Sequence, residues 1–157
     1  MGRPVLDSKE IPTLFEDDKI INKEVIIDDN KYNITCVNVG NPHCIVFVDN
    51  VDDLDLQKIG PKFENYLMFP NRINTEFVEV LKDGTLKMRV WERGAGETLA
   101  CGTGSTATLV ASVLNNKSKR NNIIHLRGGD LEIKWDEDTN ELFMTGTATK
   151  VFDGDIE

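Results

Sequence analysis

The chain has 157 residues, of which 39% are hydrophobic and 29% are charged, as in an ordinary soluble globular domain. This length suits one domain with a substantial hydrophobic core, and the composition argues against disorder. The net charge of −9 disfavours nucleic acid or an anionic membrane as a partner.

The three cysteines, Cys36, Cys44 and Cys101, indicate a reducing environment. Their odd number and wide spacing make a poor disulfide framework, and without a C-x-x-C pair no structural zinc or other metal is expected. The sequence shows neither an apolar run of about 20 residues nor a cleavable leader pattern. We therefore expect a cytoplasmic protein with no membrane attachment.

The first part of the chain predicts a connector followed by three strands. Residues 1–22 combine two prolines with an acidic cluster and are expected to form an extended lead-in. Two β-rich segments, residues 25–28 and 32–39, flank a polar turn and predict a hairpin. The sequence GNPH at residues 40–43 ends this pattern, and an apolar, buried strand is expected at residues 44–48.

The middle of the chain predicts a helix and a second hairpin. Residues 54–66 have apolar side chains at helical spacing, and Pro61 marks a break or the restart of a helix. Residues 75–81 and 85–90 alternate around a Lys-Asp-Gly turn, which is a strong hairpin signal.

The last part predicts a buried helix and a β-meander. The helix is expected at residues 103–115, and strands are expected at residues 123–126, 131–135 and 141–145. Residues 147–157 contain a further strand-like segment. Together these elements predict an α+β fold with a mostly antiparallel sheet and two helices.

Cys101 is the first candidate for chemistry. It follows a glycine-rich turn and precedes the buried helix, so its thiol should lie at the positive end of the helix dipole, which favours the thiolate. Gly102 and Gly104 leave the backbone open to close ligand approach, and Thr103 adds a hydroxyl. The N–H groups of the first turn could bind a carboxylate. The alternative is a small, buried, structural cysteine.

Five other polar residues could contribute to the same site. Arg93 suits a carboxylate and Glu92 an ammonium group, as in a zwitterionic ligand; the alternative is a surface ion pair. His43 is a catalytic candidate or a hydrogen-bonded structural residue. Asn41 and Asn74 could donate to a ligand or simply stabilise turns.

The polar segments, taken together, resemble the diaminopimelate epimerase family. The run ERGAGETLACGTG at residues 92–104 resembles the second cysteine motif of that family, and GNPHC at residues 40–44 resembles its Asn-Pro-His segment. Residues 69–77, FPNRINTEF, resemble the segment between the two. Order and spacing agree over nearly the whole chain. The resemblance implies a lobe in which a mostly antiparallel sheet wraps around a central helix.

The resemblance also implies that a second lobe is missing. The family has two similar lobes, each of which gives one catalytic cysteine to a cleft between them, and no counterpart of the first cysteine motif is found here. We therefore expect residues 1–146 to be the C-terminal lobe. Residues 147–157 would be a terminal strand that packs on the N-terminal lobe.

The activity implied by the resemblance is the interconversion of LL- and meso-diaminopimelate, on the route to lysine and peptidoglycan precursors, without pyridoxal phosphate, metal or other cofactor. One cysteine removes the α-proton as a thiolate, and the other returns a proton to the opposite face as a thiol. The resemblance implies that Cys101 is one acid–base group and that Gly102 and Thr103 bind the reacting carboxylate. It implies that the rest of the substrate is bound by Asn41, Asn74, Glu92 and Arg93. His43 and Glu92 would tune the thiols.

Three expectations follow for the chain alone. It should be inactive, since half of the acid–base pair is missing, and Cys101 should be exposed to solvent. Bare apolar faces would favour a homodimer. Two other functions stay open: an isomerase of the same fold that acts on another amino acid, and a non-catalytic module that binds carboxylates.

Overall fold

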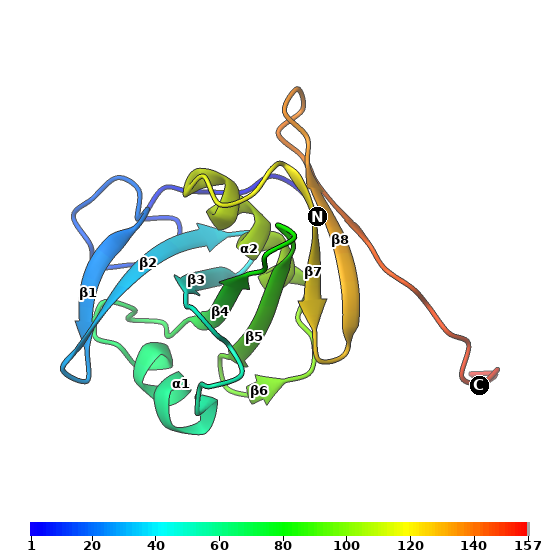
Figure 1. The fold of residues 1–157 in the computed structure, drawn as a ribbon, viewed down its shortest axis with the longest axis horizontal. Helices are drawn as coiled ribbons and strands as arrows, with labels where there is room; N and C mark the ends of the chain where they lie inside the picture. Colours follow the sequence, from blue (N-terminus) through cyan, green and yellow to red (C-terminus); the bar gives the residue numbers. More distant parts are fainter. Residues whose placement is uncertain (157) are drawn as a thin grey trace.

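Residues 1–156 are described by a computed structural model, in which one nine-stranded sheet packs against two helices (Figure 1). The last residue of the expected terminal strand, Glu157, lies outside the described residues. The elements in chain order are β1 (Lys23–Ile27), β2 (Asn30–Asn38), β3 (Pro42–Phe47), α1 (Leu56–Glu64), β4 (Asn74–Val80), β5 (Leu86–Glu92), β6 (Gly96–Thr98), α2 (Gly102–Leu114), β7 (Asn121–Leu126), β8 (Gly129–Trp135) and β9 (Leu142–Thr145).

The sheet is mostly antiparallel, as the sequence predicted, with two parallel pairings. Strands follow the order β1-β2-β3-β4-β5-β7-β8-β9, and β6 pairs with β5. The parallel pairs are β3 with β4 and β5 with β7. Each needs a crossover, because parallel strands cannot be joined by a tight turn. Helix α1 supplies the first crossover, and β6 with α2 supplies the second.

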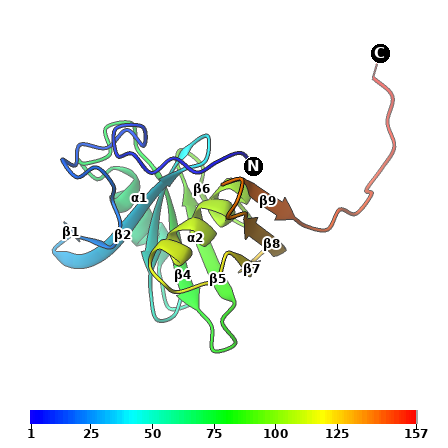
Figure 2. The same cartoon turned by 90° about the horizontal axis from the view of Figure 1, so that it is seen from above.

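Helix α2 is the centre of the fold, and the curved sheet wraps around it (Figure 2). It packs against β2, β3, β4, β7, β8 and β9. Its side chains are apolar or small on every face, which is typical of a buried helix. The hydroxyls of Ser105, Thr106 and Ser112 donate to carbonyls one turn earlier, at 2.8–2.9 Å, so their burial leaves no hydroxyl without a partner.

A second core lies on the other face of the sheet, under α1. The Phe63 ring lies edge-on to Tyr32 and Phe77, with centroid distances of 4.9 and 5.2 Å. Asp55 caps the helix by accepting from the Lys58 N–H. Pro61 lies inside α1, which continues to Glu64, so the proline does not divide the helix. Cys36 and Cys44 are fully buried in this core, away from α2.

The lead-in of residues 1–22 does more than connect. Ile11 and Ile20 are buried in the core under α1, and the segment forms backbone hydrogen bonds with Cys36 and Asn38 of β2. Near its start, Val5 pairs with Asn38 of β2 and Gly2 pairs with Leu142 of β9. The first residues thus link β2, near one end of the strand order, to β9 at the other end.

One further element differs from the sequence prediction. Strand β6 was not predicted, since three residues within a glycine-rich turn carry no periodicity. Residues 147–156, predicted to form a terminal strand that packs on a second lobe, are extended without strand pairing and lead away from the sheet (Figure 1); that strand stays a prediction. None of the helices in residues 1–156 is long and apolar enough to cross a membrane.

Candidate active site at the start of the central helix

Strand register brings the candidate residues together at one end of three neighbouring strands, β3, β4 and β5. His43 pairs with Asn74 where β3 and β4 begin, and Thr75 pairs with Trp91 where β5 ends. The first turn of α2 lies against the same strand ends. The sequence segments that begin at residues 41, 74, 92 and 101 therefore meet in space, and we call this arrangement the Cys101 site.

Cys101 is the N-cap residue of α2. Its Sγ accepts from the Gly104 N–H at 3.3 Å and lies 3.5 Å from the Thr103 hydroxyl. Only 8% of the residue is exposed, so the expectation of an exposed Cys101 is wrong. The reason is local: the capping geometry turns the side chain under the first turn, while Met144 of β9 lies over Gly102.

The surroundings of Cys101 favour the thiol over the thiolate. Burial raises the pKa of Cys101 above its ordinary value, and the nearby charge of Glu76 raises it further. Hydrogen bonds from Thr103 and Gly104 lower the pKa, while Glu92 raises it. The helix dipole alone predicted the opposite sign, because the sequence does not show which charges the fold places beside the helix end.

Glu76 is the site residue that sequence reasoning missed. It is fully buried, and its Oε1 accepts from His43 Nδ1 at 2.7 Å. His43 is also fully buried, and its Nε2 lies 2.8 Å from Asn41 Oδ1. The available signal was a lone acidic residue inside an apolar strand. In β4 it shares a face with Val78, and that face packs against α2.

Asn74 joins the three strand ends of the site. Its Nδ2 donates to the Pro42 carbonyl at 2.8 Å, and its Oδ1 accepts from the Arg93 N–H at 3.0 Å. The Arg93 guanidinium donates to the Asn71 carbonyl. The structure therefore shows Asn74 holding the backbone around the site.

The turn that carries Glu92 and Arg93 is held from below by a carboxylate of α1. Glu64 accepts from the Trp91 indole N–H at 2.7 Å and from the Gly94 N–H at 2.9 Å. The Glu92 carboxylate accepts from the Thr98 hydroxyl across the same turn. Both strands of this turn are thereby fixed relative to the sheet.

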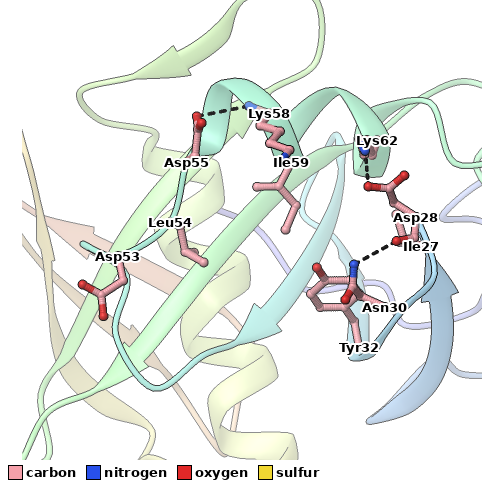
Figure 3. A pocket seen from close by; sticks show the side chains of 10 residues that line it. All are labelled: Ile27, Asp28, Asn30, Tyr32, Asp53, Leu54, Asp55, Lys58, Ile59 and Lys62. Carbon is pink, nitrogen blue, oxygen red and sulfur yellow. Dashed lines mark hydrogen bonds and ion pairs between the residues drawn. The ribbon is translucent and has the colours of Figure 1, made fainter.

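A separate pocket lies on the α1 side of the sheet (Figure 3). It encloses about 230 Å³ between α1 and the β1–β2 hairpin. Three of its charged side chains are engaged with neighbours: Lys62 pairs with Asp28, and Asp55 caps α1. It shares no lining residue with the Cys101 site. Throughout residues 1–156, no three His, Cys, Asp or Glu side chains are grouped as a metal would require.

The close packing around Gly104 gives a first prediction. A Cβ at Gly104 would lie 2.6 Å from Glu76 Oε1 and 3.1 Å from Cys101 Sγ. Alanine favours a helix over glycine by about 1 kcal/mol, but overpacking costs about 1–3 kcal/mol. We expect Gly104→Ala to lower the free energy of unfolding by about 1–2 kcal/mol in urea titrations.

Gly102→Ala is the matched control for this stability measurement. Its Cβ would meet only the flexible end of Met144, at 3.1 Å, which can move aside. We therefore expect Gly102→Ala to be no less stable than the unsubstituted chain. Equal stability of the two alanine variants would show that Glu76 and Cys101 do not press on Gly104.

Comparison with known proteins first defines the class. A solved hydroxyproline epimerase from Agrobacterium vitis superposes with a TM-score of 0.54 over 73% of this chain and 40% of that chain, at 12% identity. The chain therefore shares the fold of that epimerase. The match to the diaminopimelate epimerase family model, over residues 35–151, is more specific. The chain belongs to the diaminopimelate epimerase family.

Curated relatives carry the same family name. The chain is 53% identical over its full length to a diaminopimelate epimerase of Methanococcus maripaludis, covering 57% of that protein, and 54% identical to one of Acetivibrio thermocellus, covering 56%. A chloroplastic diaminopimelate epimerase of Oryza sativa is 51% identical over 98% of the chain, which covers 46% of it. The chain thus spans about half the length of these relatives.

Proposed function

We propose that this chain supplies Cys101 as one of the two acid–base groups of an epimerase that interconverts LL- and meso-diaminopimelate. The observation that carries the proposal is the position of Cys101 as the N-cap of α2, beside backbone N–H groups and buried polar partners. Family membership supports the choice of substrate. The length of the relatives supports a second half that completes the site.

The proposed chemistry is a proton exchange at the α-carbon. A base on one face removes the α-proton, and the Cys101 thiol gives its proton to the opposite face; the thiolate and the protonated base that result interchange protons before the next turnover. Two opposed groups are needed, because inversion requires approach from both sides. Negative charge that develops on the substrate carboxylate would be stabilised by the N–H groups of Gly102 and Thr103.

The surrounding side chains have proposed binding roles. Arg93 and Asn41 would contact the distal amino-acid end, and Glu92 its ammonium group. Asn74 would act largely by positioning Arg93, given its two backbone hydrogen bonds. His43 would sit behind this contact surface and tune the thiol chemistry.

The test is exchange of the α-proton into D2O, followed by NMR with LL-diaminopimelate. We expect no inversion by this chain alone, because only one face of the substrate can be served. Inversion should appear when the chain is mixed with the separately expressed N-terminal half of the Acetivibrio thermocellus relative.

The controls separate the alternatives. Sizing chromatography must show that the two halves associate. Inversion by the chain alone would contradict the need for a second half. No exchange in a proven complex would argue against diaminopimelate and favour another amino acid or a carboxylate-binding role.

A further inference from the structure

Glu76 holds a position that the proposed roles do not explain. Its side chain is fully buried, with Oε1 on His43 Nδ1 and, among residues 1–156, no hydrogen-bond partner for Oε2. Leaving a buried carboxylate oxygen without a donor costs free energy, so the residue calls for a physical reason.

The neighbours of Glu76 suggest the reason. A Cβ atom placed on Gly104 would lie 2.6 Å from Glu76 Oε1 and 3.1 Å from Cys101 Sγ. They therefore flank the first turn of α2 at close range. Only glycine at position 104 leaves room for both groups.

Two opposing charges act on the thiol across this turn. The end of α2 offers about half of a positive charge, which favours the thiolate. Glu76 can place a whole negative charge against the same turn, which favours the thiol. Glu92 on β5 acts in the same direction from the other side, and from β9 the neighbour is the uncharged Met144. Burial, which contributes most, and the two acidic groups together raise the pKa of the Cys101 thiol.

We propose that Glu76 is a positioning residue for the acid–base chemistry: it fixes His43 and holds Cys101 as the protonated, proton-donating member of the pair before substrate binds. This rests on the proposed function in taking Cys101 as an acid–base group. It adds a direction, because a Cys101 that begins as the donor requires the group opposite to begin as the base.

The test measures the pH profile of Cys101 alkylation by iodoacetamide in the full chain, with each cysteine resolved by peptide mass spectrometry. Only the thiolate reacts, so the rate reports its population. We expect Glu76→Gln, which keeps the shape and removes the charge, to react roughly tenfold faster at pH 7 and to shift the profile about one pH unit lower.

Glu79→Gln is the matched control. Glu79 lies on the same strand with its side chain on the other face, where it accepts from the Val51 N–H at 3.2 Å. It should leave the profile unchanged. Cys36 and Cys44 are 1% and 0% exposed, against 8% for Cys101, and should stay unreactive in every variant, which reports that the variant is folded. An unchanged or slower reaction of Cys101 in folded Glu76→Gln would overturn the proposal.

A second measurement covers the case in which Glu76→Gln does not fold. In the unsubstituted chain with ¹³C-labelled glutamate, the Glu76 carboxyl resonance should shift at the pH at which Cys101 ionises, since the two charges interact. The absence of that step would equally overturn the proposal. Neither measurement uses diaminopimelate or a second lobe, so its outcome is independent of the proton-exchange test of the proposed function.

Discussion

Replacing Cys101 by alanine is expected to lower kcat/KM of the assembled two-half enzyme by roughly 10³-fold or more. An acid–base group typically contributes about 10²- to 10⁴-fold to the rate. Without the thiol, nothing at the start of α2 can deliver a proton to the substrate. Binding should be less affected, because the N–H groups of the first turn remain in place. The measurement is α-proton exchange into D2O, with ligand affinity determined in parallel.

Cys44→Ala is the control for this substitution. Cys44 is a buried cysteine in the core under α1, on the face of the sheet opposite α2, so its removal should leave turnover close to that of the unsubstituted enzyme. Full turnover by Cys101→Ala would exclude Cys101 as an acid–base group. An unchanged affinity together with no turnover in either protein would instead favour a binding module.

Replacing Phe63 by alanine is expected to produce the largest loss of stability, about 3–5 kcal/mol in the free energy of unfolding. The ring is fully buried and lies edge-on between Tyr32 and Phe77, so its loss leaves a cavity that rigid neighbours cannot fill. The next residue, Glu64, holds Trp91 and Gly94, so loosening α1 should also loosen the turn of the Cys101 site. Urea unfolding measures the effect.

Leu67→Ala is a suitable comparison, because Leu67 follows the same helix but is 85% exposed. Its effect should stay within about 0.5 kcal/mol, as for most surface substitutions. A similar small loss in Phe63→Ala would mean that the aromatic cluster does not anchor α1.

The sequence predicted well the helices and strands that bury one face over several residues. The hairpins and both helices were predicted with bounds close to those observed, because alternation and helical spacing report burial directly. Pro61 was misleading, since α1 tolerates it near its C-terminal end. The lead-in was underestimated because Ile11 and Ile20 are isolated apolar residues, and isolated residues carry no period.

The candidate residues named from the sequence lie close together in the fold, whereas Glu76 and the electrostatics around Cys101 were not predicted. The residues of three separate motifs meet where β3 and β4 begin and β5 ends. The burial of Cys101 and the role of Glu76 could not be predicted, because both depend on contacts between strands β3 and β4 and the first turn of α2. A helix dipole can be read from sequence, whereas a carboxylate brought against it by strand register cannot.

The pairing of Gly2 with Leu142 has a consequence for how the chain folds. Contacts between residues so distant in sequence can form only after the intervening chain is in place, since closing a long loop costs entropy that few local contacts offset. The N-terminal segment that joins β2 to β9 should therefore be the last to form its strand pairings. Until it does, the sheet remains open between β2 and β9, and the nascent domain is at its most vulnerable to proteolysis and misassociation.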